Sequence, residues 1–358
     1  MIGPRQKVAI VIPSLAGGGA ERVMLQVAGG LDSSRFDVTL IALNGKGDLS
    51  GALPSSLHFV DLGTARLRHA IGLLTDTLRG LGPDVVVSTM GYLNLAILAF
   101  VRPRLSPACR YVVREANMPE ATISQFPLRL MGRLGYRLFY PKADRVVCNA
   151  QTVAAALRNL GVPAGIIAQI DNPIDVDFLR GTAEDIHRSE SGRHFIAVGR
   201  LTRQKGFDRL IDWFQELPAD CRLTILGDGP DRADLEHRRH TNGLDDRVSM
   251  PGFCLAPWRE VAQADAFLMP SRWEGMPNAA LEALALGVPV IAMRDAGGLG
   301  ELSNAVPAGH LTIAKDGPAF IQAMQDTVKL AGGLRPAALP DRFRKDKVLD
   351  AYAEIIAG

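Results

Sequence analysis

Short apolar segments alternate with helical stretches along almost the whole chain, and this alternation starts twice. The pattern is typical of doubly wound α/β folds, in which helices cover both faces of a parallel sheet. The predicted strands are 8–12, 38–42, 57–60, 85–88, 111–113 and 145–148 in the first series, and 194–198, 222–226, 248–251, 266–269 and 288–292 in the second. Two Rossmann-like domains also suit 358 residues, a length beyond one ordinary core.

A boundary is expected between the two series. Residues 172–175 read Asn-Pro-Ile-Asp, and a polar stretch follows at 180–193. The last segment, 344–356, spaces its apolar residues as a helix with one apolar face. We therefore predict domains at 1–172 and 173–340, followed by a C-terminal helix within 341–358.

Composition excludes several classes of protein. Hydrophobic residues make up 47% of the chain, yet runs such as 93–101 fall far short of the ~20 residues of a membrane span. A net charge of +2 gives no reason to expect a nucleic-acid partner. The cysteines lie far apart, which favours reduced thiols and a cytoplasmic location. They are Cys109, Cys148, Cys221 and Cys254.

The segment 269–291, MPSRWEGMPNAALEALALGVPVI, contains the most informative pair of residues. Glu274 is predicted in the loop after a buried strand, and Glu282 in the early part of the next helix. The helix start offers backbone N–H groups to an anion such as phosphate. Carboxylates accept hydrogen bonds from hydroxyl groups. Amides for phosphate and acids for hydroxyls together indicate a sugar-nucleotide site.

A second candidate loop follows the first strand. Gly17, Gly18 and Gly19 remove side chains where a ligand must approach the backbone closely. A plain flexible turn is the alternative. The spacing differs from G-x-G-x-x-G, so a nicotinamide-dependent dehydrogenase is not favoured.

Two cations follow the first strand of the second series. Arg200 and Lys205 could reach one diphosphate from the same loop, Arg as a fork of donors and Lys as a point charge. The alternative is a pair of solvated surface charges. Further turns in this half contain Gly227, Phe253 and the glycine-rich run 297–300, each compatible with ordinary turn chemistry.

No metal site is predicted. Asp175 and Asp177 imitate the D-x-D motif of metal-dependent sugar transferases, but they fall in the linker and are better explained as a solvated turn. His237 and His240 are neighbours on a helix without a third ligand.

Taken together, these loops resemble glycosyltransferase family 4. The resemblance runs from GGGAERV through NPID, VGRLTRQKG, LGDGP and MPGF to EGMPNAALEALALGVPV. It implies the GT-B fold, with two facing Rossmann-like domains, a cleft between them and a C-terminal helix returning toward the N-terminal domain. It also implies transfer from a nucleotide sugar with retention of anomeric configuration, without metal or other cofactor. A UDP-sugar is the expected donor.

The resemblance assigns roles residue by residue. Arg200 and Lys205 would hold the donor diphosphate, Glu274 the sugar and Glu282 the ribose. The implied donor-binding residues are Gly18, Gly19, Arg200, Lys205, Gly227, Phe253, Glu274, Gly275, Met276, Asn278 and Glu282. The catalytic candidates are Glu274, Arg200, Lys205 and Glu115.

The acceptor side departs from the family pattern. Many relatives have a histidine after the strand that matches 111–113, where this chain has Arg114, Glu115 and Asn117 around an alanine. Similar clusters occur in members that build lipid-linked and surface polysaccharides. We expect Glu115 or Arg114 to contact acceptor or donor, and we count Gly17, Arg114 and Asn117 as acceptor-binding.

A basic and apolar helix is predicted within 125–145. Arg129, Arg133 and Arg137 recur every four residues, with Leu, Met, Phe and Tyr between them. Such a helix can lie on an anionic membrane. The alternative is a helix that packs within the domain while its arginines extend to water.

The predicted function is therefore a retaining glycosyltransferase of surface polysaccharide, lipopolysaccharide or glycoconjugate synthesis. It would act on a glycan or lipid-linked acceptor, at the cytoplasmic membrane face. Two alternatives stay open: a sugar-nucleotide epimerase on the same scaffold, and a non-catalytic partner subunit.

Overall fold

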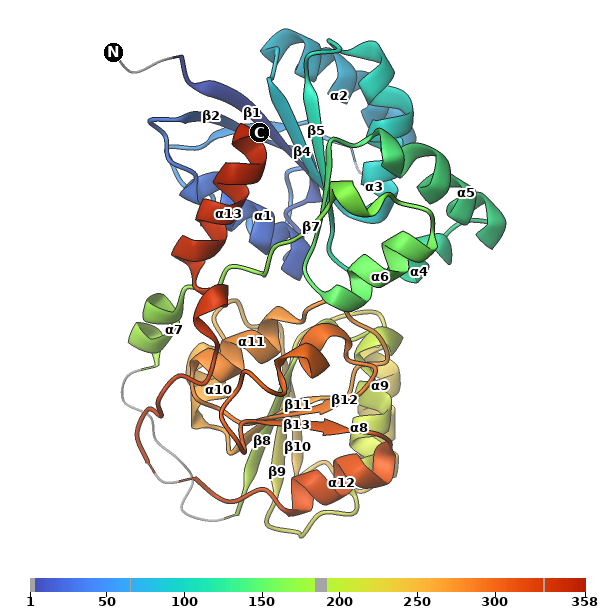
Figure 1. Cartoon of the computed structure of the whole chain (residues 1–358). Helices are drawn as coiled ribbons and strands as arrows, with labels where there is room; N and C mark the ends of the chain where they lie inside the picture. Colours follow the sequence, from blue (N-terminus) through green and yellow to red (C-terminus); the bar gives the residue numbers. More distant parts are fainter. Residues whose placement is uncertain (1–3, 65, 184–191, 331) are drawn as a thin grey trace. The chain divides into compact units, whose positions relative to one another are not determined.

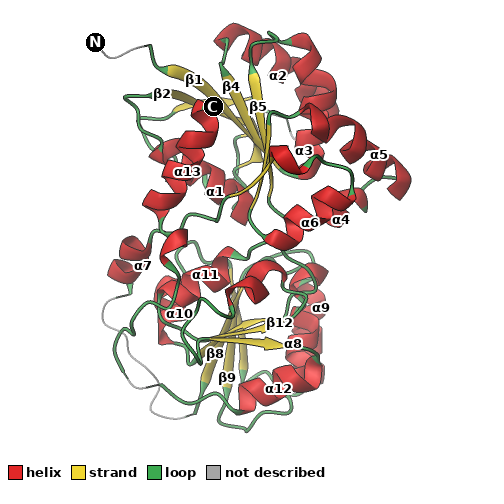
Figure 2. Ribbon diagram, viewed as in Figure 1, coloured by secondary structure: helices red, strands yellow, loops and turns green. Residues whose placement is uncertain are grey.

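The computed structural model describes residues 4–64, 66–183, 192–330 and 332–358. Residue contacts divide the chain into two units. The first comprises the chain up to Pro173 together with Lys345–Gly358, and the second is Ile174–Arg344. Each is described separately below, and Figures 1 and 2 show the elements of both.

The first unit contains a parallel sheet of order β3-β2-β1-β4-β5-β6-β7. Its strands are β1 (Gln6–Ser14), β2 (Phe36–Asn44), β3 (His58–Asp61), β4 (Val85–Thr89), β5 (Arg110–Glu115), β6 (Arg145–Cys148) and β7 (Ile167–Gln169). Its helices are α1 (Gly19–Gly30), α2 (Leu67–Leu81), α3 (Gly91–Ala96), α4 (Pro119–Ile123), α5 (Arg129–Phe139), α6 (Gln151–Asn159) and α13 (Lys345–Ala357). The central strands are apolar and buried, as parallel sheets require.

The second unit contains a parallel sheet of order β10-β9-β8-β11-β12-β13. Its strands are β8 (His194–Val198), β9 (Arg222–Leu226), β10 (Val248–Gly252), β11 (Ala266–Met269), β12 (Val290–Met293) and β13 (Leu311–Ala314). Its helices are α7 (Val176–Thr182), α8 (Phe207–Phe214), α9 (Arg232–Thr241), α10 (Trp258–Gln263), α11 (Asn278–Ala285) and α12 (Gly317–Gln325). The predicted α/β class with two parallel sheets is confirmed.

The sequence did not indicate two of the strands, β7 and β13. Each lies at the edge of its sheet, and at most one residue in each strand is fully buried. An edge strand does not need the continuous apolar run that marks a central parallel strand. The linker also differs from the expected turn, because Asp175 and Asp177 lie at the N-terminal end of helix α7.

The C-terminal helix α13 completes the core of the first unit. Val348, Tyr352 and Ile356 are buried in one cluster with residues of α1, β1 and β2, and Figure 1 shows α13 beside α1. The backbone carbonyl of Ile356 also accepts a hydrogen bond from Arg110 Nη1 on β5, at 2.9 Å. One face of α13 is therefore part of the first unit's core.

Replacing Ile356 by alanine should destabilise the first unit by about 2–5 kcal/mol, because it leaves a cavity beneath α13. Hydrogen exchange should then speed up in β1 and β2 but not in β8 and β9. The neighbouring Ile355 is only partly buried, so Ile355→Ala makes the same chemical change at a smaller cost. Equal effects of the two variants would contradict the packing described.

Candidate active site

Apart from Gly18 and Gly19, which belong to the first unit, the predicted donor-binding residues lie in the second unit. Strand order reverses between β8 and β11, and ligands of open α/β sheets bind at the carboxyl ends of strands at such a reversal. Arg200 and Lys205 lie in the loop after β8, and Glu274 in the loop after β11. Glu282 is the fifth of the eight residues of α11.

Lys205 and Glu274 form an ion pair across these two loops. Lys205 Nζ lies 2.7 Å from Glu274 Oε1, and the exposed side-chain fractions are 21% and 8%. Ser271 Oγ donates to the same oxygen at 2.9 Å, and Gln204 Nε2 donates to Oε2 at 3.3 Å. The Glu274 carboxylate is thus held between the two loops, with one cation and two neutral donors.

Arg200 provides a second positive charge in the same loop. Its side chain is exposed and makes no hydrogen bond or ion pair within the part of the chain that the structure describes. The stem of Lys205 lies over Gly199, where an added Cβ would be 3.3 Å from Lys205 Cδ. Of the two cations, one is therefore paired with Glu274 and the other faces solvent.

Glu282 interacts with an aromatic residue that the sequence did not indicate. Trp258 Nε1 donates to Glu282 Oε2 at 3.2 Å, and Glu282 is 9% exposed. The Trp258 ring in turn meets the edge of Phe178, with 5.2 Å between centroids. Glu282 and Trp258 are 24 residues apart and share no motif, so only the fold brings them together.

The glycine turns let neighbouring loops pack backbone against backbone. Gly227 has φ 147°, and a Cβ there would lie 1.9 Å from the Gly199 carbonyl oxygen. Gly297 has φ 75°, and its Cβ would lie 2.2 Å from the Gly275 carbonyl oxygen. Close loop packing explains these two glycines without a ligand.

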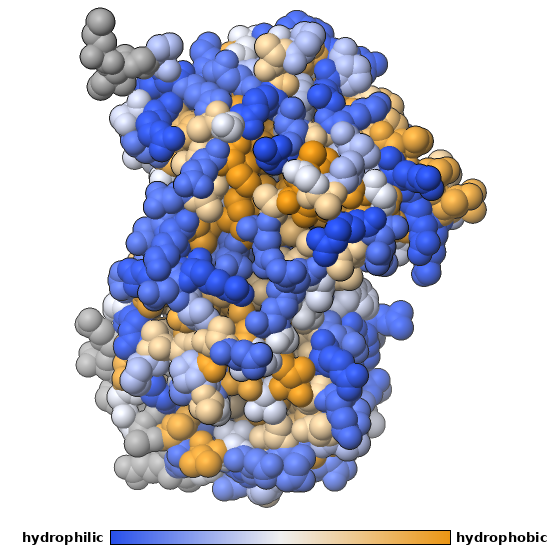
Figure 3. Space-filling model, in the orientation of Figure 1, coloured by the Kyte–Doolittle hydropathy of each residue, from blue (hydrophilic) through white to orange (hydrophobic). Residues whose placement is uncertain are grey.

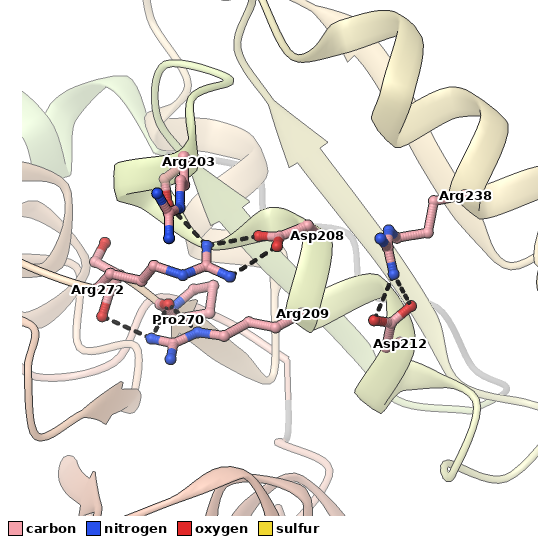
Figure 4. A network of polar contacts seen from close by, with 8 residues as sticks. Arg203, Asp208, Arg209, Asp212, Arg238, Pro270 and Arg272 are labelled. Atoms are coloured by element: carbon pink, nitrogen blue, oxygen red, sulfur yellow. Dashed lines mark hydrogen bonds and ion pairs between the residues drawn. The ribbon is translucent and has the colours of Figure 1, made fainter.

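Two further arginines, Arg209 and Arg272, join the loop after β11 to helix α8 (Figure 4). Arg209 on α8 donates to the carbonyl oxygens of Pro270 and Ser271, through Nε at 2.7 Å and Nη2 at 2.8 Å respectively. Arg272 forms a two-point ion pair with Asp208 at 2.8 and 2.7 Å. Burial opposes ionisation of Asp208, but the hydrogen bonds from Arg272 bring its pKa below the ordinary value. The first part of the loop after β11, residues 270–272, is thereby fixed to α8.

The remaining donor-side residues occupy varied environments. Phe253, directly after β10, is 46% exposed, whereas Met276 is buried at 4%. Gly275 accepts a hydrogen bond through its carbonyl oxygen from Gly298 N at 2.6 Å. Asn278 is the first residue of α11. The structure thus places these residues in or beside the loops after β10 and β11.

The predicted glycine loop belongs to the first unit. Gly17 has φ 89°, and Gly19 begins helix α1. A Cβ at Gly18 would lie 2.2 Å from Glu21 Oε2, and Glu21 is only 8% exposed. Gly18 therefore accommodates a buried carboxylate, which the sequence analysis did not single out.

Arg114 and Asn117 bond within the first unit. Arg114 is 1% exposed, and its Nη2 donates to Asn172 Oδ1 at 2.7 Å. Asn117 Oδ1 accepts from the backbone N–H of Met118 at 2.8 Å. Contact of either residue with an acceptor stays a prediction.

Glu115, the last residue of β5, is buried against two tyrosines. Its Oε2 accepts hydrogen bonds from Tyr136 at 3.0 Å and from Tyr140, whose stacked rings have centroids 4.4 Å apart. Burial raises the Glu115 pKa to about 7, although both tyrosine hydrogen bonds act in the opposite direction. Glu115 thus connects β5 to α5, and direct contact with a substrate stays a prediction.

Asp175 and Asp177 both have local structural partners. Asp175 Oδ1 accepts from the backbone N–H of Phe178 and caps α7, while Asp177 pairs with Arg344 at 2.9 Å. Among the described residues, no three histidine, cysteine, aspartate or glutamate side chains are grouped to hold a metal ion. In those same residues, no helix has the length and apolarity of a membrane span.

Two family models match this chain. The model described as Glycosyltransferase Family 4 matches residues 17–178, and that described as Glycosyl transferases group 1 matches residues 192–329. These ranges contain the glycine loop, the 114–117 cluster, Lys205 and both glutamates.

Two relatives with similar sequences are bacterial glycosyltransferases. The chain is 27% identical over 310 residues to the N-acetylgalactosamine-N,N'-diacetylbacillosaminyl-diphospho-undecaprenol 4-alpha-N-acetylgalactosaminyltransferase of Campylobacter jejuni, covering 83% of each chain. It is 25% identical to the lipopolysaccharide core biosynthesis glycosyltransferase LpsE of Rhizobium meliloti, covering 95% of this chain and 96% of that one.

Solved structures share the fold. Anabaena Alr3699/HepE in complex with UDP-glucose superposes with a TM-score of 0.76 at 18% identity, covering 99% of this chain and 100% of that one. The lipopolysaccharide outer core galactosyltransferase WaaB gives 0.71 at 19% identity, covering 98% and 99%. Both comparisons support the predicted two-domain architecture.

The pKa of Glu115 predicts a pH-dependent stability. Its folded-state value of about 7 exceeds the ordinary 4.5, so its contribution to stability is fully present below pH 4.5. It is lost as pH rises toward 7, by about 3 kcal/mol. Glu115→Gln removes the titration, so its melting temperature relative to the unmodified protein should rise between pH 5 and pH 8. Glu354→Gln, which removes an exposed acid on α13, should show no such trend. Parallel profiles for the unmodified protein and Glu115→Gln would contradict the assignment.

Proposed function

The chain belongs to the family 4 glycosyltransferases, and on that premise we propose that it transfers a sugar from a UDP-sugar to a lipid-linked glycan with retention of anomeric configuration. The product would enter a lipopolysaccharide or surface polysaccharide. Relatives from Campylobacter jejuni and Rhizobium meliloti support this class of pathway, since they act on a diphospho-undecaprenol-linked sugar and in lipopolysaccharide core synthesis.

The observation that carries the proposal is the Lys205–Glu274 contact of 2.7 Å beside the exposed Arg200. The strand order of the second unit's sheet reverses between β8 and β11. The loops after these two strands contain both cations and the carboxylate. A diphosphate requires the cations and sugar hydroxyls require the acid. UDP as the base-bearing part is supported by Anabaena HepE, whose fold this chain shares and which binds UDP-glucose.

We propose a reaction that needs neither a protein nucleophile nor a metal ion. The bond between sugar C1 and the diphosphate oxygen breaks, and UDP leaves with the bonding electron pair. Arg200 and Lys205 stabilise the charge that develops on that oxygen. The acceptor hydroxyl forms the new bond to C1 on the same face, and its proton passes to the departing phosphate. Glu274 orients the sugar and Glu282 the ribose.

Binding the diphosphate would reorganise the ion pair. Lys205 can turn from Glu274 toward phosphate, because its side chain retains 21% exposure. Glu274 would keep the Ser271 and Gln204 donors and gain hydroxyl partners from the sugar. The donor would thus replace the cation that now satisfies the carboxylate.

Among UDP-, GDP- and ADP-sugars, UDP-sugars should raise the melting temperature most, because they are the proposed donors. A ligand at a hundred times its Kd stabilises the folded protein by about 2.7 kcal/mol. Arg200→Ala should weaken this binding about tenfold or more, because it removes a charge-assisted hydrogen bond. Arg203→Ala is the matched control, as it removes an exposed arginine from the same loop. Equal losses from the two variants, or no preference among the nucleotides, would contradict the donor assignment.

UDP release should require an undecaprenyl-diphosphate-linked glycan, and Glu274→Ala should lower it by about a hundredfold while donor binding persists. The product should retain the donor's anomeric configuration by NMR, and turnover should survive EDTA. Isomerised UDP-sugar without an acceptor would identify an epimerase instead. Unchanged transfer by Glu274→Ala in a complex would identify a non-catalytic subunit.

A further inference from the structure

Helix α5 turns its apolar side chains toward water. The exposed fractions are 66% for Leu130, 53% for Met131, 44% for Leu134 and 58% for Leu138, and Leu128 just before the helix is 63% exposed. At 100° per residue, Leu130, Leu134 and Leu138 form one stripe. In Figure 3 hydrophobic side chains protrude where Figure 1 draws α5. We call these five residues the α5 apolar face.

The helix packs on its unit through a different side. Gly132 and Tyr136 are its buried residues, and a Cβ at Gly132 would lie 3.0 Å from the Ile123 backbone. Tyr136 and the following Tyr140 donate to the buried Glu115. A surface helix ordinarily buries its apolar stripe. Here a glycine and two hydrogen-bonded tyrosines make the contact, so the α5 apolar face is not needed for packing.

A row of arginines borders this face. Arg129, Arg133 and Arg137 are exposed, and none makes an ion pair within the residues that the structure describes. Lys142 continues the basic character, lying 4.8 Å from the centroid of the Phe139 ring. Residues 121–143 contain no aspartate or glutamate. The whole segment is therefore apolar and positively charged, with no internal neutralisation.

We propose that the α5 apolar face and its three arginines dock the enzyme onto an anionic phospholipid bilayer. Leucine and methionine side chains would enter the boundary between headgroups and acyl chains, and the arginines would bind the phosphates beside them. A second copy of this chain fits less well, because two copies would bring arginine rows together without acids. The charge thus favours an anionic lipid surface.

Docking here would deepen the proposed function, since it rests on that function only for the lipid-anchored acceptor. Tyr136 of α5 donates to Glu115 at the carboxyl end of β5, within the 114–117 cluster that is predicted to contact the acceptor. One unit would then contain both the lipid-bound helix and the acceptor loop. The enzyme could then reach a membrane-anchored glycan while it stays bound to the bilayer.

The test is flotation of the full chain with vesicles, without sugar nucleotide or glycan. Vesicles of phosphatidylglycerol and phosphatidylcholine should bind the protein, and pure phosphatidylcholine should bind it much more weakly. Arg129→Gln/Arg133→Gln/Arg137→Gln should lower partitioning at least about tenfold. Leu130→Gln/Leu134→Gln/Leu138→Gln should lower it similarly, and binding should weaken with salt.

Matched controls separate docking from net charge and from misfolding. Arg66→Gln/Arg68→Gln/Lys315→Gln also removes three exposed positive charges, and it should float as the unmodified protein does. Each variant should keep its melting temperature and its stabilisation by UDP-sugar, so loss of vesicle binding is distinguishable from failure of the donor site. No binding to anionic vesicles, or equal binding by all variants, would overturn the proposal. The proposal would also be overturned if the unmodified protein did not bind vesicles but associated with itself, and the leucine variant abolished that self-association.

Discussion

The contact between Lys205 and Glu274 joins the loops after β8 and β11 of the second unit. A carboxylate with 8% of its side chain exposed needs several hydrogen-bond donors, and here it receives them from Lys205, Ser271 and Gln204. If the two loops separated, Glu274 would keep only the Ser271 hydroxyl, which lies in its own loop. In this pair Lys205 satisfies the Glu274 carboxylate. The hydroxyl groups of a sugar could satisfy the same carboxylate. In the proposed reaction, a bound diphosphate and sugar would therefore exchange partners with this pair.

Parallel topology makes that contact available, and glycines let the neighbouring loops pack closely. All carboxyl ends of a parallel sheet meet at one edge, so loops from β8 and β11 emerge side by side. Gly227 and Gly297 then allow adjacent loops to approach to distances that any Cβ would forbid. The glycine-rich composition of these turns thus has a structural cause that is independent of any ligand. It also explains why residues from four separate segments reach one region.

Much of the fold could be predicted from the sequence, because buried parallel strands need continuous apolar runs. The edge strands β7 and β13 were not predicted, because many of their residues are partly exposed to solvent and do not form a continuous apolar run. In the candidate site, residues within one motif were predictable, whereas partners from distant segments were not. Trp258 and Glu282 illustrate this, as do Tyr136 and Tyr140 around Glu115. The 114–117 cluster marks Glu115 as a candidate site residue, but the sequence alone does not reveal that its partners are two tyrosines more than twenty residues away.

Glu115 and α5 depart from ordinary rules of folding in opposite directions. The first unit buries a carboxylate, which raises its pKa toward neutrality, while it leaves leucines and a methionine in water. Each departure opposes stability by itself. They coincide in one helix because the tyrosines that bind Glu115 occupy the packing side, and this leaves the apolar side free. Natural sequences break local rules mainly where function demands it. Because α5 packs through glycine and hydrogen-bonded tyrosines, its leucines stay outside the core, as the proposed docking on a lipid surface requires.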